Sequence, residues 1–401
     1  MDTYIKSPEP SIGTTGETPG EELPRPAISG PSRLQSLDVM RGITVAVMIL
    51  VNTSGDGSHT YPILAHSHWN GCTLADIVFP CFLFMVGVSS VLSLSGRLRR
   101  GVPRAILIRQ ALQRTAIIFG LGLVINGFPT FPLHTLRIFG VLQRIAICYL
   151  AATLLFLWSR TRTLALLFLA ILVGYWILLR WVRVPGMGIP GSTIPFLDPH
   201  ANLPAWLDRH LLPARHLYHQ GFYDPEGLLS TIPSIASTLL GTLTGIWIRR
   251  KEPTSTTARA ILVAGIVCLA VGLLWSNWFP LNKRLWTSSF VLWTGGISLV
   301  ALSILIWLVD LGGKASRVVY PAIVFGTNAL AAYIFSELLA ALLGTLRLPG
   351  STTSLQRWFY HPLAAVIPNP SVAALVYAIL FVGVCFLPVL ILYRKQIFLK
   401  V

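Results

Sequence analysis

Residues 65–80 read AHSHWNGCTLADIVFP, a polar cluster that runs directly into an apolar segment. The apolar part carries a lone acid, Asp76, and continues to about Leu94. A run of this length approaches the ~20 residues that a helix needs to cross a bilayer. The stretch therefore predicts a membrane helix with a histidine-containing loop at its mouth.

Comparable apolar runs recur from about residue 39 to the C-terminus. Of the 401 residues, 54% are hydrophobic and 11% are charged, whereas soluble domains carry about 25% charged residues. We therefore expect an all-α, polytopic transmembrane helix bundle of about ten spans. The chain shows no clear internal repeat, so an inverted-repeat transporter is not supported.

The expected spans follow one another along the chain. They cover about 33–52, 73–94, 105–126 and 136–158, then a fifth that ends near 181, then 226–248, 260–278, an eighth that ends near 309, 320–346 and 372–393. Residues 1–32 are rich in Pro, Gly, Ser, Thr and Glu, so we expect a disordered cytoplasmic tail. Residues 33–401 would form one transmembrane domain, with extracytoplasmic loops near 55–72, 183–225, 279–285 and 347–370.

The net charge of +16 comes largely from short basic clusters between the apolar runs. With ten spans these clusters share one side of the membrane, which the positive-inside bias marks as cytoplasmic. They are Arg97/Arg99/Arg100, Arg160/Arg162, Arg249/Arg250/Lys251 and Arg394/Lys395. This placement argues against a nucleic-acid partner and predicts an inner (plasma) membrane protein with both termini in the cytoplasm.

A metal site is one interpretation of the first polar loop, because His66 and His68 have His59 and Asp56 nearby. Zinc needs three or four fixed donors, and these lie on one short loop without a known ligand spacing. We therefore expect no metal. The five cysteines are scattered and show no CxxC spacing, so we expect no disulfide framework.

Several polar side chains fall inside the expected spans, where an ionisable group costs ~2.5–3.5 kcal/mol on insertion scales. They are Asp76, Gln143, Arg144, Asn328 and Glu337. Asp76, Arg144 and Glu337 belong to the outer half and could converge beneath the loop that holds His66. Two structural alternatives stay open: an Asp76–Arg144 ion pair that fixes helix packing, and an interhelix hydrogen bond from Asn328.

Residues 223–227 have the pattern of a helix start. Asp224 would be the N-cap, and Pro225 would occupy the first helical position. This structural role explains Asp224 more simply than catalysis does. Glu226 has no such explanation and stays a candidate for binding.

Six ordered motifs make the chain similar to a known family. They are Arg33-Leu34…Ser36-Leu37-Asp38…Arg41-Gly42; His66…Trp69-Asn70-Gly71…Asp76-Ile77-Val78-Phe79-Pro80; Gly140-Val141-Leu142-Gln143-Arg144-Ile145-Ala146; Asp224-Pro225-Glu226-Gly227-Leu228-Leu229-Ser230-Thr231-Ile232-Pro233; Asn282-Lys283…Leu285-Trp286-Thr287-Ser288-Ser289-Phe290; and Phe325-Gly326…Asn328-Ala329-Leu330. Through them the chain resembles the heparan-alpha-glucosaminide N-acetyltransferase family over most of its length after the tail. The resemblance implies transfer of acetyl from cytosolic acetyl-CoA to an amino sugar or other glycan acceptor on the far side of the bilayer, and it suggests a homodimer.

The resemblance also implies roles for single residues. The family's catalytic histidine precedes the Trp-Asn-Gly motif by three positions, which selects His66, and its active-site asparagine at the end of the first membrane helix corresponds to Asn52. Asp76 could hold His66 in the correct tautomer, as a carboxylate does in a triad. The candidate substrate contacts are Trp69, Asn70, Arg144, Glu226, Asn282, Lys283, Trp286 and Asn328. The candidate cations for CoA are Arg41, Arg97 and Arg114.

The chemistry itself sets two requirements for such a site. Acyl transfer from a thioester to an amine needs a base for the amine's proton and a donor for the oxyanion. An imidazole suits the first task, and Asn52 or Asn70 could supply the second. The sequence leaves open whether His66 acts as base or carries the acetyl group covalently. The alternative function is a transporter or flippase of a glycan or lipid-linked precursor, whose His66 loop only gates.

Overall fold

A computed structural model describes residues 34–251, 254–312, 317–350 and 352–399. The expected tail, residues 1–32, lies outside these ranges. The regular structure of the described residues is helical, with thirteen α-helices and no strand longer than an isolated bridge. The all-α prediction is therefore confirmed.

The described residues form helices that follow one another along the chain. They are α1 Gln35–Asn52, α2 Leu74–Arg99, α3 Arg104–Gly127, α4 Val141–Trp158, α5 Thr161–Trp181, α6 Leu203–Leu211, α7 Leu228–Lys251, α8 Ser255–Trp275, α9 Ser288–Leu305, α10 Tyr320–Thr327, α11 Ala329–Thr345, α12 Leu355–Val366 and α13 Pro370–Arg394. Within the described ranges, nine helices are long and apolar enough to cross a bilayer. α10 and α11 form a tenth candidate span that bends by 83° at Asn328. The expectation of about ten spans is confirmed.

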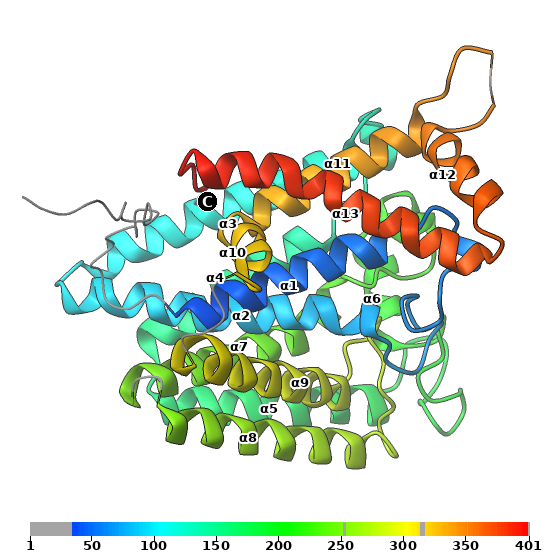
Figure 1. The fold of residues 1–401 in the computed structure, drawn as a ribbon. Coiled ribbons are helices and arrows are strands. Elements are labelled where there is room, and N and C mark those ends of the chain that lie inside the picture. The colour runs from blue at the N-terminus through cyan, green and yellow to red at the C-terminus, as the bar shows by residue number, and fades with distance from the viewer. Residues whose placement is uncertain (1–33, 252–253, 313–316, 351, 400–401) are drawn as a thin grey trace, which may run out of the picture. The chain divides into compact units, whose positions relative to one another are not determined.

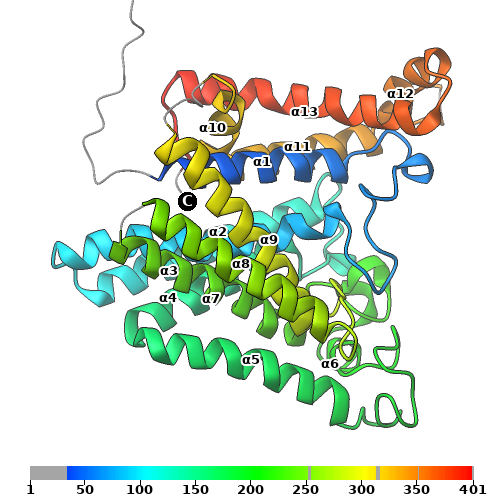
Figure 2. The same cartoon turned by 60° about the horizontal axis from the view of Figure 1, so that its bottom comes forward.

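The spanning helices form two groups that meet along α1 and α2. α1, α10, α11 and α13 share one apolar core, and α2, α4, α5, α7, α8 and α9 share a larger one (Figures 1 and 2). Between them lies a third set of buried side chains, the junction cluster: Met48, Val78, Ile118, Leu142, Ala146 and Tyr333. This cluster contains residues from both groups and lies beneath the loop that follows α1.

The connections at the two ends of the bundle differ in size. The loop end holds the long connections 53–73, 182–227, 276–287 and 346–369, which gather at the right of Figure 1. The basic end holds the short turns after α2 and α4, together with the basic clusters described above. Residues 34 and 399 both lie at the basic end, because α1 starts there and α13 finishes there.

The backbones of α2 and α7 approach each other closely at two glycine residues, one on each helix. A Cβ atom at Gly87 would overlap the carbonyl oxygen of Thr238, and one at Gly241 would overlap that of Phe84. Small residues at such crossings let two helix backbones approach closely in a membrane, where dispersion contacts hold helices together. This contact fixes the distance between the two helices that carry most of the site described below.

The long connection 182–227 is tied to the start of α7 by Asp208 of α6. Its carboxylate accepts a hydrogen bond from the backbone N–H of Asp224 (3.1 Å). Gly227 leaves room for this approach, since a Cβ there would overlap the Asp208 carboxylate. Burial raises the pKa of Asp208 from 3.8 to about 6.

A Gly87→Ala substitution is expected to lower the thermal unfolding temperature of the detergent-solubilised protein. The added methyl group has no space, and overpacking of this kind costs about 1–3 kcal/mol. Gly174→Ala on α5 is the matched control, because a Cβ there meets nothing within 4 Å. Equal unfolding temperatures for the two variants would contradict the close α2–α7 contact.

An Asp208→Asn substitution is expected to remove a pH dependence of stability. The folded state disfavours the ionised carboxylate, so its cost is absent below about pH 4 and complete above pH 6, where it reaches about 3 kcal/mol for a shift of two pKa units. Raising the pH from 4 to 7 should therefore destabilise the parent protein more than the variant. Thermal unfolding at both pH values measures this, and parallel pH profiles would show that Asp208 does not carry the effect.

Candidate active site

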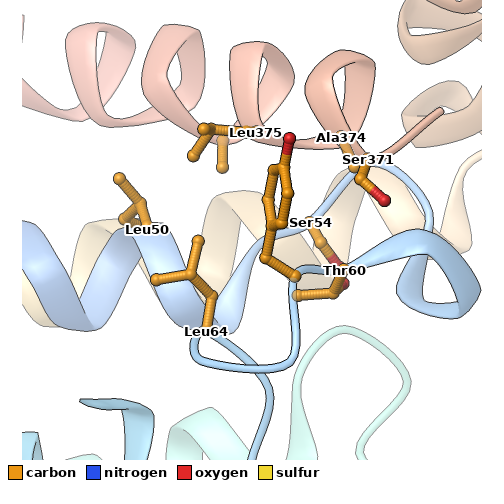
Figure 3. Close-up of a pocket in the computed structure, with 9 residues that line it drawn as sticks. Leu50, Ser54, Thr60, Leu64, Ser371, Ala374 and Leu375 are labelled. Atoms are coloured by element: carbon orange, nitrogen blue, oxygen red, sulfur yellow. The ribbon is translucent and has the colours of Figure 1, made fainter. Parts of the chain in front are cut away.

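The loop after α1 is seated against α13. The Leu64 side chain of this loop faces Leu50 of α1 and Leu375 of α13 (Figure 3). The space left between these surfaces is about 10 Å³, the least that can hold one water molecule. A hydrogen bond from Gln356 Nε2 to the carbonyl oxygen of Ser54 (2.9 Å) adds a polar tie. The loop is therefore closely packed where it leaves α1.

Asp76 organises the second half of the loop. One carboxylate oxygen accepts hydrogen bonds from the backbone N–H groups of Ser67 and Thr73 (3.1 Å each), and the other lies 2.9 Å from His66 Nδ1. Asp76 is the third residue of α2, where a carboxylate both caps the helix and faces the positive end of its dipole. Its side chain is 1% exposed, whereas that of His66 is 46% exposed. The imidazole is therefore held on its Nδ1 side by the buried Asp76 carboxylate, and about half of its side chain is exposed.

Lys283 completes this group from the turn between α8 and α9. Its Nζ lies 3.1 Å from His66 Nδ1 and 3.5 Å from Asp76 Oδ1. His66 Nδ1 cannot donate to Asp76 and accept from Lys283 at the same time. With Asp76 ionised, the Nδ1–H donates to the carboxylate, and Nε2 keeps its lone pair. Burial lowers the pKa of Lys283, and the charge of Asp76 opposes that effect.

The turn between α8 and α9 also anchors the loop. Asn282 Nδ2 donates to Asn70 Oδ1 (3.1 Å), and the Gly71 N–H donates to the Leu281 carbonyl (2.7 Å). On the other side, Trp69 Nε1 donates to the Leu197 carbonyl (2.7 Å) in the long connection. The Trp-Asn-Gly motif therefore holds the loop between two other connections.

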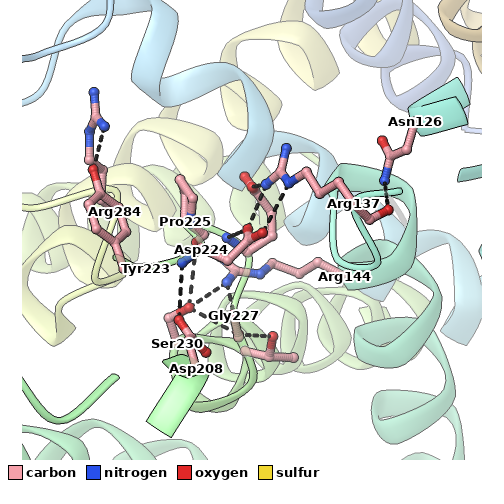
Figure 4. A network of polar contacts seen from close by, with 12 residues as sticks. Asn126, Arg137, Arg144, Asp208, Tyr223, Asp224, Pro225, Gly227, Ser230 and Arg284 are labelled. Atoms are coloured by element: carbon pink, nitrogen blue, oxygen red, sulfur yellow. Dashed lines mark hydrogen bonds and ion pairs between the residues drawn. The ribbon is translucent and has the colours of Figure 1, made fainter. Parts of the chain in front are cut away.

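A second group of charges lies next to the first. Arg137 donates to Asp224 through Nε (3.0 Å) and Nη2 (2.6 Å), and Nη2 also donates to Glu226 (2.5 Å) (Figure 4). Burial alone would raise the pKa of Glu226, but the cations Arg137, Arg144 and Lys283 hold it below its ordinary value. Glu226 thus interacts electrostatically both with Arg137 in its own group and with Lys283 in the group around His66.

These ion pairs correct the predicted start of α7. The helix begins at Leu228, about one turn after the predicted start, and Asp224 pairs with Arg137 instead of capping it. The sequence interpretation missed Arg137 altogether. Its signal was a single arginine immediately before an apolar span, and that position alone does not name a partner 87 residues away.

Arg144 lies fully inside the protein on α4. It donates to Ser230 Oγ (2.5 Å) and to the Gly227 carbonyl (3.3 Å), and its guanidinium lies 5.1 Å from the ring centroid of Trp286. Asp76 pairs with His66 and Lys283, so the suggested Asp76–Arg144 ion pair is wrong. Arg144 instead joins α4 to the start of α7.

Trp286 has an unusual backbone. Its φ is +53°, in the left-handed region that side chains with a Cβ rarely adopt. The buried indole donates from Nε1 to Ser237 Oγ (3.1 Å) on α7. Strain of this kind persists only where the surroundings impose it, and it concentrates at functional sites. The indole therefore fixes the turn that carries Lys283.

The remaining candidates, Asn52 and Asn328, form hydrogen bonds with partners other than His66. Asn52 Nδ2 donates to Glu337 Oε1 (3.2 Å) on α11. Asn328 lies at the bend, where its side chain donates to the Ile397 carbonyl (3.1 Å) and accepts from the Leu399 N–H (3.0 Å). Asn328 thus holds the C-terminal segment near the basic end.

The three candidate cations for CoA lie on α1, α2 and α3, away from the loop end. Arg41 donates to Asp38 and to Ser89 Oγ (2.8 Å each). Arg97 donates to Gln110. The Arg114 guanidinium lies 4.7 Å from the ring centroid of Tyr149. They are not brought together with His66.

The same loop carries two other side-chain groups of reactive types, the His59–Asp56 pair and Cys72. His59 pairs with Asp56 at 2.8 Å, separately from His66, and no cluster of three or more His, Cys, Asp or Glu suited to a metal occurs in the part of the chain that the structure describes. Burial, reinforced by the charge of Asp76, raises the pKa of Cys72 to about 12. Its thiol therefore stays protonated and is a poor nucleophile.

Comparison with known proteins gives one family. The family model described as heparan-alpha-glucosaminide N-acetyltransferase, catalytic, matches residues 33–272. The human protein named heparan-alpha-glucosaminide N-acetyltransferase is 29% identical over 363 residues, which cover 77% of this chain and 53% of that protein. The mouse protein of the same name is 29% identical over 369 residues, covering 78% and 54%. The chain thus spans about half the length of the curated relatives it matches.

The family match includes the His66 motif, Asp76, Arg137, Arg144 and Glu226. The motifs at Asn282 and Asn328 lie beyond its end. The membrane-spanning helices and the family match are consistent with each other. This chain is a multi-pass membrane protein that belongs to the heparan-alpha-glucosaminide N-acetyltransferase catalytic family.

Proposed function

We propose that the chain is an integral membrane acyltransferase that moves an acetyl group from acetyl-CoA to an amino sugar or other glycan acceptor. The observation that carries the proposal is the fixed pair of His66 and Asp76 at the loop end. The acceptor binds at this end, on the extracytoplasmic side. Acetyl-CoA is supplied from the cytoplasm, on the side of the basic end and of both chain termini, which is the orientation expected in the plasma membrane.

In the direct route the acceptor amine attacks the thioester carbonyl. His66 Nε2 removes the amine's proton as the carbon–nitrogen bond forms, and the CoA thiolate leaves as the carbon–sulfur bond breaks. The proton on the imidazole then passes to the thiolate, so CoA leaves as a thiol. Asp76 keeps the Nδ1–H tautomer and stabilises the imidazolium that forms, as the carboxylate does in a catalytic triad.

In the two-step route His66 Nε2 attacks the thioester itself. The carbon–sulfur bond breaks, the CoA thiolate leaves and the imidazole carries the acetyl group. The acceptor amine then displaces the imidazole in a second attack, and the amine's proton passes to the released imidazole and from there to solvent. The same Asp76 contact serves both routes, because both need a lone pair on Nε2. Labelled acetyl-CoA without acceptor separates them: only the two-step route leaves label on the protein, and only where His66 is present.

The surrounding residues support this chemistry in different ways. Asn70, anchored by Asn282, and Asn52 are the candidate donors to the oxyanion. Lys283 is a cation next to the imidazole and to Asp76, placed to balance the buried carboxylate. Trp69 lies on the loop itself and Glu226 on the long connection before α7, and both are candidate contacts for an amino sugar.

A His66→Ala substitution is expected to abolish acetyl transfer to glucosamine by the purified, reconstituted protein. Asp76→Asn should lower the rate by about 10³–10⁴-fold, because an amide no longer selects the reactive tautomer. Transfer of label from acetyl-CoA to the sugar measures both. His68→Ala is the matched control, since His68 lies two residues away on the same loop and its side chain is exposed.

Two results would overturn this proposal. One is a well-folded His66→Ala protein that transfers acetyl as fast as the parent. The other is movement of unmodified glycan precursor into vesicles without acetyl-CoA, which would favour the transporter alternative. The size-exclusion profile of each variant shows whether it is folded, which matters for Asp76 because it also caps α2.

A Lys283→Gln substitution is expected to lower the rate of acetyl transfer, because it removes the cation that balances the buried Asp76 carboxylate. Lys283→Arg keeps the charge and should retain more of the parent rate. Transfer of label from acetyl-CoA to glucosamine measures both variants. Equal rates for the parent and Lys283→Gln would show that Lys283 does not support the site.

A further inference from the structure

A cavity of about 390 Å³ opens at the basic end of the bundle, between the ends of α2, α4 and α7 and the start of α5. This volume falls in the range of small-molecule sites, about 300–1,000 Å³. Its polar lining consists of Ser95, Arg99, Ser159, Thr161, Arg249 and Arg250. No residue of the His66 group contributes. The distance along α2 from Asp76 to Arg99 is about 35 Å at 1.5 Å per residue, so the cavity is a separate place.

The charge of the cavity is positive and is not neutralised by the residues described. Among them, no carboxylate forms an ion pair with Arg99, Arg249 or Arg250. Glu252, the next acid in the sequence, lies outside the described residues. Arg99 and Arg249 are close enough to repel each other electrostatically. Like charges held across a cavity are relieved when an anion binds between them.

Two further sets of donors serve the same space. Ser95 is fully buried and lines the cavity, and its hydroxyl has no hydrogen-bond partner among the described residues. A buried unpaired hydroxyl costs about 1–3 kcal/mol, which a ligand oxygen would offset. The N-terminus of α5 also lies here, at Thr161, and no side chain in the described part of the chain caps it. The N–H groups of its first turn and the helix dipole favour an anion.

An ordinary cytoplasmic arginine cluster, present only to orient the protein in the membrane, would not need these features. Such residues require neither a cavity nor a buried donor. Here Arg250 Nη2 is ordered by donating to Thr161 Oγ1 (3.0 Å), the first residue of α5. Val91, Phe156 and Ile246 add apolar surface to the lining, which suits a ligand with a phosphate group and an apolar part.

We propose that this cavity binds the phosphate group of an anionic ligand through Arg99, Arg249, the Ser95 hydroxyl and the α5 N-terminus. Two sources share this chemistry: the headgroup of an anionic phospholipid in the adjoining leaflet, and a soluble nucleotide phosphate such as the one that CoA carries. Basic pockets between membrane helices are known to take lipid headgroups. The proposal does not rest on acetyl transfer, because binding is measured without turnover.

The test uses the full chain in a neutral detergent and measures binding by the rise in unfolding temperature. One arm titrates dioctanoyl phosphatidylglycerol, with dioctanoyl phosphatidylcholine as the zwitterionic comparison. The other arm titrates adenosine 3′,5′-bisphosphate. Saturable stabilisation is expected in at least one arm, and the arm that responds identifies the source. No stabilisation in either arm would overturn the proposal.

Substitutions then locate the binding. Arg249→Gln should weaken it by about tenfold or more, the loss expected for a charge-assisted hydrogen bond. Arg100→Gln is the matched control, because it removes the same charge one residue beyond Arg99 without lining the cavity. Equal losses in the two variants would mean a diffuse surface effect and would reject the site.

Ser95→Ala provides a variant whose folding is not at risk. Because the hydroxyl has no partner, its removal should leave the ligand-free protein as stable as the parent or slightly more so. It should still weaken binding several-fold. Unchanged binding, or lower stability without ligand, would contradict the proposed role of Ser95.

Discussion

The Asp76 carboxylate is the interaction on which the loop end depends. It closes the first turn of α2, fixes the backbone of the preceding loop and orients His66. A carboxylate this deeply buried is tolerable only if every lone pair has a partner, since an unpaired charge inside a protein or membrane costs several kcal/mol. The backbone donors, the imidazole and Lys283 supply those partners.

The same logic extends into the neighbouring group. One set of charges consists of Arg137, Asp224 and Glu226, and the other consists of His66, Asp76 and Lys283. The two sets interact because the negative charge of Glu226 attracts the Lys283 ammonium group. Buried ion pairs add little stability over apolar residues of similar size. These charges therefore position the side chains of the loop end more than they stabilise the fold, and the two groups together make the loop end strongly polar.

Much of the fold could be predicted because span length and apolarity are local properties of the sequence. The position of Asp76 below His66 was also predictable, since ten residues of one loop and helix start separate them. The contact from Lys283 was not, because it joins residues 217 positions apart. The bend at Asn328 and the later start of α7 depend on tertiary partners, Leu399 and Arg137, which no local pattern specifies.

The anchoring of the first loop has a consequence for how the family can diverge. His66 is fixed by Asp76 and Lys283, and the backbone after it is fixed by Asp76 as well. Among the described residues, the hydrogen bonds that tie residues 53–65 to the rest of the protein are those from Gln356 to the Ser54 carbonyl and from the Leu74 N–H to the Ile63 carbonyl (3.2 Å). Insertions or deletions before His66 can therefore reshape the rim of the site without moving the imidazole. In the proposed acyltransferase, acceptor preference and catalytic geometry would therefore rest on separate segments, so one could change while the other is kept.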